Sequence, residues 1–176
     1  MELARWFDDW LPAAERRRTY ARLSRRQSAT PDIPRPALVR PDEWERTRTF
    51  GVVIDTSGSM GRELLGKALG AIASYTVARD VDRARVVFCD AAAHDAGWLA
   101  PDDIAGRVRV RGRGGTVLQP GIDLLERAAD FPKTGPILVI TDGRCDRLRI
   151  RREHAFLIPK GHRLPFTPKG PVFRME

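Results

Sequence analysis

Three oxygen-bearing side chains alternate along one short stretch of the chain: Asp55, Ser57 and Ser59. They follow the apolar run 50–54, which has the composition of a buried strand, and Gly58 favours a tight bend between the serines. Loops at the carboxyl edge of a parallel sheet are where α/β folds bind ligands, so we expect these side chains to converge there. One carboxylate and two hydroxyls supply half of an oxygen cage for a small hard cation such as Mg²⁺, which prefers near-octahedral oxygen ligation.

Two further loops could bring oxygen ligands to the same point. A glycine-rich stretch ends at Thr116, and the apolar run 137–140 ends in a Thr-Asp-Gly turn that contains Asp142. The runs 50–54 and 137–140 are the most apolar of the chain, which predicts that they are central neighbours in one sheet. Loops that follow neighbouring strands face one crevice. Together the three loops would offer two Ser hydroxyls, one Thr hydroxyl and two carboxylates.

Each of these side chains also has an ordinary structural use. Ser57, Ser59 and Thr116 could cap the helices that follow them. Asp142 could be a simple turn residue before Gly143. Each structural interpretation is sufficient for one residue taken alone, but the joint occurrence of three such loops, two of which follow the most apolar predicted strands, favours a cation site.

The elements that would position these loops alternate along the centre of the chain. Apolar runs predict strands, and three- and four-residue periodicity predicts helices between them. This alternation indicates the α/β class, with a Rossmann-like, doubly wound, mostly parallel sheet flanked by helices. The predicted strands are 49–54, 84–90, 97–100, 137–140 and 154–158, and the predicted helices are 61–78 and 120–129. The first helix is expected to turn inward Leu64, Leu65, Ala68, Leu69, Ile72, Ala73 and Val77.

The flanks of this core differ from it in composition. Residues 1–28 have the apolar spacing of an amphipathic helix with two Trp on one face, which could dock on the core or on a partner. Residues 29–48 are rich in Pro and charge and are predicted to be an extended linker. The core domain is assigned to 49–160, and residues 161–176 are expected to form a basic extended tail.

The chain of 176 residues has room for one α/β domain and an arm, and its net charge is +8. That charge is uneven, at +3 for residues 1–48, −1 for 49–142 and +6 for 143–176. Cys89 and Cys145 form neither a disulfide framework nor a metal-binding spacing. The start of the chain lacks a signal-peptide pattern, and no apolar run reaches the length of a membrane span. We therefore expect a soluble cytoplasmic protein.

About residues 48–160 resemble a von Willebrand factor type A (VWA) domain. In that family a metal-ion-dependent adhesion site, or MIDAS, combines an Asp-x-Ser-x-Ser loop, a Thr on a second loop and an Asp on a third. The matching positions, in that order, are Asp55, Ser57, Ser59, Thr116 and Asp142. The resemblance implies that Ser57, Ser59 and Thr116 bind Mg²⁺ directly, with Mn²⁺ as an alternative ion. Asp55 and Asp142 would act directly or through water.

Within this family, the chain looks most like bacterial VWA-like domains that follow a predicted metallopeptidase-like region. The Gly-Gly-Thr loop ending at Thr116 and the segment 156–166 carry this finer resemblance. Two features depart from the branch. Val117 stands where an Asp often follows the Thr, and no His-Glu-x-x-His motif is present, so no peptidase site is expected.

The expected function is a magnesium-dependent protein-interaction module rather than an enzyme. A cation held by neutral hydroxyls and two carboxylates keeps Lewis acidity and can accept an Asp or Glu carboxylate from a partner protein. The resemblance suggests a partner complex such as a bacterial ATPase.

Two alternatives belong to other functional classes. A metal-dependent hydrolase or phosphatase is one, although the Asp-x-Asp spacing of aspartyl-phosphate enzymes is missing because Ser57 takes the third position. Binding to nucleic acid or an anionic surface is the other, through the arginines of residues 109–113 and 144–152. Nucleic acid is disfavoured because no aromatic side chains interleave with these arginines.

Overall fold

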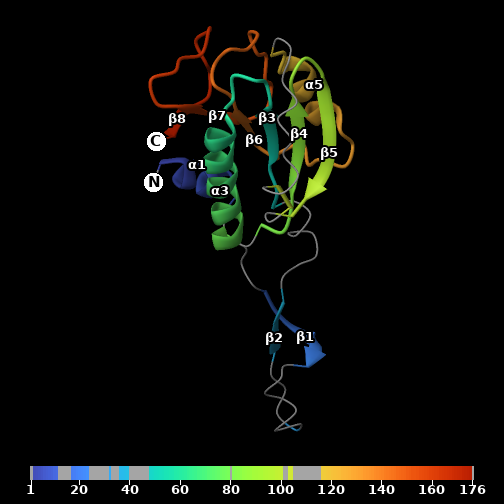
Figure 1. Cartoon of the computed structure of the whole chain (residues 1–176). Coiled ribbons are helices and arrows are strands. Elements are labelled where there is room, and N and C mark those ends of the chain that lie inside the picture. Colours follow the sequence, from blue (N-terminus) through green and yellow to red (C-terminus); the bar gives the residue numbers. More distant parts are fainter. Residues whose placement is uncertain are drawn as a thin grey trace.

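The computed structural model describes residues 2–11, 17–23, 32, 36–39, 48–79, 81–100, 103–104 and 116–175. Its centre is a six-stranded sheet with the strand order β5-β4-β3-β6-β7-β8 (Figure 1). All neighbouring strands are parallel except β4 and β5, which are antiparallel. The strands are β3 (Gly51–Asp55), β4 (Ala84–Cys89), β5 (Ala93–Leu99), β6 (Ile137–Ile140), β7 (His154–Pro159) and β8 (Val172–Met175).

Helices cover both faces of this sheet. On one face α1 (Glu2–Trp10) and α3 (Arg62–Arg79) pack on Val52 and Ile54 of β3. On the other face α5 (Gln119–Arg127) packs on Val53 of the same strand. Successive residues of a strand point to opposite faces, so the fully buried β3, apolar up to its last residue Asp55, contributes side chains to two cores. The predicted α/β, doubly wound class is confirmed.

The first 28 residues are not one helix. The helix ends at Trp10, and β1 (Arg17–Leu23) pairs antiparallel with β2 (Pro36–Val39) in a separate two-stranded sheet. The prediction was wrong for 17–23, and the predicted linker 29–48 contains a strand. The helical apolar spacing is confined to the first turns, whereas β1 carries the β-favouring Thr19 and Tyr20. A strand that pairs across a Pro-rich stretch has little local signature.

The N-terminal helix could dock on the core of its own chain or on a partner protein. In the structure it packs on the core of its own chain. The Phe7 ring stacks on Tyr75 with centroids 4.4 Å apart and lies 4.6 Å from Phe50. Trp6 is buried and contacts Phe173, which belongs to β8. The helix therefore covers the sheet face near its C-terminal strand.

Three further details differ from the expectation. The predicted basic tail ends in β8, which adds to β7 in parallel register, so residues 172–175 belong to the sheet. The short strand predicted at 97–100 begins earlier, at Ala93. Val77 is 68% exposed, whereas the two residues of α3 that precede it, Tyr75 and Thr76, are buried.

No helix in the described part of the chain is both long enough and apolar enough to cross a membrane.

Candidate metal centre

The predicted adjacency of the two most apolar strands is confirmed. β3 and β6 are parallel neighbours in the middle of the sheet, with Ile54 opposite Ile140. Every residue of both strands is buried. Asp55 is the last residue of β3, and Asp142 lies two residues beyond β6, so their two loops leave the same edge of the sheet.

The Asp55 carboxylate is fully buried and is held by both loops. Its Oδ1 accepts a hydrogen bond from the backbone N–H of Ser57 at 2.9 Å. Its Oδ2 accepts one from the Thr141 hydroxyl at 2.8 Å, across the gap between β3 and β6. Each carboxylate oxygen therefore has a partner from a different loop, which fixes the plane of the carboxylate at the strand end.

The two serine hydroxyls of the first loop lie together. Ser57 Oγ and Ser59 Oγ are 3.0 Å apart, and the backbone N–H of Met60 closes the turn by donating to the Ser57 carbonyl at 3.0 Å. Mg²⁺ binds oxygens at about 2.0–2.1 Å in octahedral geometry, which places neighbouring ligand oxygens about 2.9 Å apart. The serine spacing fits this requirement.

Electrostatics at the strand ends also favour a cation. Burial raises the pKa of the Asp55 carboxyl, hydrogen bonds from Ser57 and Thr141 oppose this, and the nearby Asp142 raises that pKa further. Asp142 is itself buried, and its Oδ1 accepts a hydrogen bond from the backbone N–H of Arg144 at 2.9 Å. A positive ion near two buried carboxylates would relieve the repulsion between them.

Thr116 lies at the same edge of the sheet, one strand further out. The neighbouring Val117 donates its backbone N–H to the carbonyl of Asp90, at the end of β4, at 3.0 Å. β4 pairs with β3 up to the register of Cys89 with Asp55. Thr116 is half-buried, and among the described residues no hydrogen bond joins it to the other four candidate ligands. Its role as a ligand stays a prediction.

Two residues outside the predicted set help to build this region. Thr141 bonds to Asp55, and Asp146 caps α5 by accepting the backbone N–H groups of Leu118 at 2.7 Å and Gln119 at 3.3 Å. Asp146 thereby links the loop after β6 to the start of α5, just beyond Thr116. Thr141 lies in the Thr-Asp-Gly turn that the sequence analysis singled out. The cap from Asp146 joins segments 28 residues apart, so no local sequence pattern reveals it.

Asp90 and His94, on which a catalytic alternative could depend, are used differently. The Asp90 carboxylate accepts the backbone N–H of Ala92 at 3.0 Å and lies 3.3 Å from His94 Nε2. The backbone hydrogen bond in this turn, followed by the contact with His94, lowers the pKa of Asp90. Asp90 thus has the geometry of a turn residue between β4 and β5.

The two cysteines near the candidate site are free thiols with little nucleophilic character. Burial is the main cause that raises the pKa of Cys89 and of Cys145 to about 12. Carboxylates of Asp55 and Asp146 act on both in the same direction. At neutral pH both side chains are therefore neutral, and neither supplies the thiolate that a catalytic cysteine needs.

Among the residues that the structure describes, no three His, Cys, Asp or Glu side chains gather as a metal-binding group. The candidate centre has only two carboxylates, and its other oxygens are hydroxyls. Such a set would suit a hard ion that keeps part of its charge for an incoming ligand.

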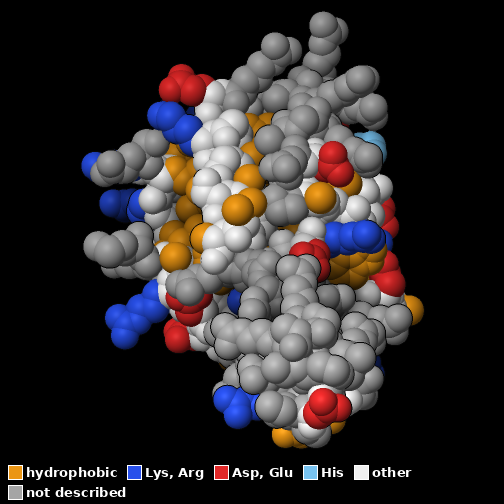
Figure 2. All heavy atoms as spheres, turned by 90° about the horizontal axis from the view of Figure 1, so that it is seen from below, with side chains coloured by type: hydrophobic (Ala, Val, Ile, Leu, Met, Phe, Trp, Pro, Cys, Tyr) orange, Lys and Arg blue, Asp and Glu red, His pale blue; other side chains and the backbone are white. Residues whose placement is uncertain are grey.

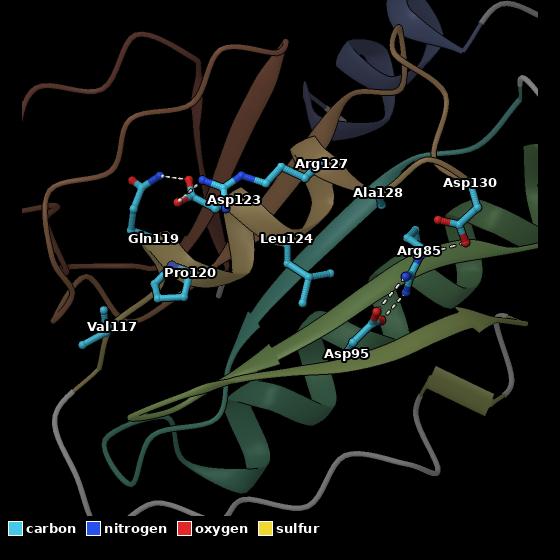
Figure 3. Close-up of a pocket in the computed structure, with 10 residues that line it drawn as sticks. All are labelled: Arg85, Asp95, Val117, Gln119, Pro120, Asp123, Leu124, Arg127, Ala128 and Asp130. Carbon is cyan, nitrogen blue, oxygen red and sulfur yellow. Dashed lines mark hydrogen bonds and ion pairs between the residues drawn. The ribbon is translucent and has the colours of Figure 1, made fainter.

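A separate pocket of about 740 Å³ lies beside α5, over β4 and β5 (Figure 3). The buried guanidinium of Arg85 pairs with both carboxylate oxygens of Asp95 and lies 3.4 Å from Asp130. Trp98 Nε1 donates to Asp130 at 2.8 Å. The charged side chains of the pocket therefore pair with one another. Val117 also lines the pocket and follows Thr116 in the chain.

Residues 50–157 match the family described as VWA-like domain (DUF2201). The chain belongs to this family. A similar solved structure is that of an aerotolerance-related membrane protein from Bacteroides fragilis NCTC 9343 with multiple mutations to serines, which shares 16% identity with the chain. The match covers 73% of this chain and 91% of that one, with a TM-score of 0.55, and it supports the VWA-like fold alone. No curated protein matches the chain.

Proposed function

We propose that this VWA-like domain binds Mg²⁺ at the edge of its sheet and uses the ion to capture an Asp or Glu carboxylate of a partner protein. The ligands would be Asp55, Ser57, Ser59, Thr116 and Asp142, with Mn²⁺ as an alternative ion. The observation that carries the proposal is the buried Asp55 carboxylate, held by two loops, next to a second buried carboxylate and to serine oxygens 3.0 Å apart.

The donor set determines what the ion could do. Neutral hydroxyls donate less charge than carboxylates, so the ion would remain strongly attractive to an additional anionic oxygen. The residues of this chain bind and orient the ion, and the partner's carboxylate completes its coordination. We propose a binding role rather than a catalytic one because Asp90 is engaged in a turn and both cysteines are protonated at neutral pH.

The family resemblance adds two finer proposals. The chain would belong with bacterial VWA-like domains linked to metallopeptidase-like regions, and it would serve a cytoplasmic complex, an ATPase being one candidate partner. Its own lack of a His-Glu-x-x-His motif is consistent with an accessory, non-peptidase role.

Isothermal titration calorimetry with Mg²⁺ and Mn²⁺ tests the metal proposal. The unaltered chain should bind one ion, and Asp55→Ala or Ser57→Ala/Ser59→Ala should weaken binding by about tenfold or more while the circular dichroism spectrum persists. Matched controls are Asp82→Ala and Ser74→Ala, two exposed residues outside the candidate centre. Absence of binding by the unaltered chain, or equal binding by all variants, would contradict the proposal.

The same proteins address the catalytic alternative. Incubation with p-nitrophenyl phosphate and Mg²⁺ should release no more nitrophenol than the buffer. Hydrolysis that requires Mg²⁺ and disappears in Asp55→Ala would show that the centre is catalytic and would contradict the binding role.

A further inference from the structure

Residues 146–152, between β6 and β7, run with their side chains pointing alternately inward and outward. Leu148 is buried in the core beneath α5, and Ile150 packs against the same core. The residues that alternate with these two are exposed. These outward residues are all arginines, namely Arg147, Arg149 and Arg151.

Side chains of α5 hydrogen-bond to the backbone of this segment, as the backbone of a neighbouring strand would. The Gln119 amide accepts the backbone N–H of Arg149 at 2.7 Å and donates to its carbonyl at 3.2 Å. Glu126 Oε1 accepts the backbone N–H of Arg151 at 2.7 Å. Asp146, at the start of the segment, caps the helix. The backbone that carries the arginines is therefore fixed at three points.

The row begins beside the candidate metal centre. β6 and β7 are parallel, so the connecting segment must travel from the carboxyl edge of the sheet back to its amino edge. Arg144, also exposed, precedes the row and donates its backbone N–H to Asp142. In an extended chain, every second residue advances by about 6.6 Å. The row thus leads away from the loops of the candidate centre along α5, with an arginine at every second residue.

These arginines have no ion-pair partner among the described residues. The described ion pairs lie elsewhere, on α3, on α5 and around Arg85 and Asp90. Asp146, the nearest acid in the sequence, is engaged in capping α5. The positive charge of the row is therefore available to an external anion.

We infer that this arginine row, Arg147, Arg149 and Arg151, is a docking surface for an extended acidic segment of a partner protein whose carboxylates alternate along its chain. Guanidinium groups pair with carboxylates in a bidentate manner, and an extended peptide repeats its side chains on one face at the spacing of the row. The inference rests on the proposed function where it adds that the same partner offers a carboxylate to the metal ion.

An acidic peptide fits this surface better than a nucleic acid does. Binding of single strands uses aromatic side chains on which bases stack. The large apolar side chains exposed on the described residues are Trp10, Tyr20, Val77 and Val117, and none lies within residues 143–175. A carboxylate, in contrast, is a ligand for both the arginines and Mg²⁺.

Fluorescence anisotropy with two labelled peptides tests the inference. In one peptide glutamate alternates with serine, and its isomer carries the same glutamates consecutively. The unaltered chain should bind the alternating peptide several-fold more tightly. Arg147→Ser/Arg149→Ser/Arg151→Ser should weaken that binding by about tenfold or more at low salt, because each exposed ion pair contributes modestly and three are lost.

A control variant with the same change in net charge separates a local effect from a global one. Arg5→Ser/Lys67→Ser/Arg83→Ser removes three exposed cations away from the row and should leave peptide affinity nearly unchanged. Gln119→Ala keeps every charge but removes the clamp on Arg149, so it should reduce the preference for the alternating peptide. Equal weakening by both triple variants, or equal affinity for the two peptides, would overturn the inference.

Further binding measurements distinguish a failure of this inference from a failure of the metal proposal. Binding measured in EDTA should retain the contribution of the row, whereas Asp55→Ala should lose only the increment that Mg²⁺ adds. An Mg²⁺ increment without an effect of the row would overturn this inference alone. A single-stranded oligonucleotide that binds more tightly than either peptide, and loses binding in the row variant, would overturn it in favour of nucleic acid.

Discussion

Asp55 is the residue at which folding stability and the proposed metal binding make opposite demands. Burial and the neighbouring Asp142 raise its pKa, so the native protein binds a proton there more readily than the unfolded chain does. The free energy of unfolding must therefore fall as the pH rises from 3.8, the ordinary pKa of an aspartate side chain, through the raised native pKa. Above that range the metal-free protein carries a desolvated charge that the hydrogen bonds from Ser57 and Thr141 compensate only in part.

We expect Asp55→Asn to stabilise the metal-free protein at neutral pH, since an amide has no charge to desolvate. The gain should disappear as the pH falls and Asp55 becomes protonated. Thermal unfolding in EDTA and in Mg²⁺, followed by circular dichroism at several pH values, measures both effects. Mg²⁺ should raise the melting temperature of the unaltered chain but not of the variant, and Asp82→Asn should behave as the unaltered chain. A lower melting temperature for Asp55→Asn in EDTA at neutral pH would contradict this argument.

At this scale, the part of the candidate centre that is local in sequence was predictable. Asp55, Ser57 and Ser59 share one turn, so their spacing determines that they face one another. The bond from Thr141 to Asp55 joins residues 86 positions apart and depends on the order of the strands. The spacing of residue types cannot reveal such a contact, although the apolar runs before both loops indicated that β3 and β6 are neighbours.

At the scale of elements, Gly121 determines how closely α5 approaches the sheet. A Cβ atom added at this position would lie 2.4 Å from Cys89 Sγ and 3.3 Å from methyl groups of Val53 and Val87. These neighbours are buried in the centre of the sheet and have little room to move. The helix carries glycine where it touches the strands, even though glycine lowers its intrinsic stability.

Gly121→Ala should therefore lower the free energy of unfolding by about 1–3 kcal/mol, the usual cost of overpacking a core. Gly66→Ala is the matched control, because a Cβ at that exposed position of α3 meets nothing within 4 Å. It should instead stabilise the protein by up to about 1 kcal/mol through helix propensity. Urea unfolding of both variants tests the pair, and a neutral or stabilising Gly121→Ala would show that α5 does not pack as closely as described.

Elements with strong periodicity or long apolar runs were predictable, and those formed by pairing were not. The helices α3 and α5 and the strands β3 and β6 were found within a few residues. β8 has only four residues, with exposed Arg174 among them, and it exists because β7 offers an edge in register with Val172. β1 likewise depends on its pairing with β2. Such strands follow from the fold rather than from their own sequence.

At the scale of the whole molecule, the two ends of the sheet differ in character. The candidate centre lies at the carboxyl ends of the parallel strands, and the arginine row begins there. Figure 2 views the molecule from below, away from that edge, where basic and acidic side chains are interspersed and apolar side chains show in separate groups. The net charge of +6 over residues 143–176 is contributed mainly by the segments that follow β6 and β7. These basic segments would attract an acidic partner.

The two ends of the chain meet on one face of the sheet, where α1 packs beside β8 (Figure 1). Phe7 is fully buried between Tyr75 and Phe50, so Phe7→Ala should lower the free energy of unfolding by about 3–5 kcal/mol. Trp10, on the same helix, is 42% exposed. Trp10→Ala should therefore change the free energy of unfolding by no more than about 0.5 kcal/mol. Urea unfolding of the two variants measures the contrast. If α1 instead served to bind a partner, Phe7→Ala would leave stability unchanged, and the packing of the helix on its own sheet would not contribute to the fold.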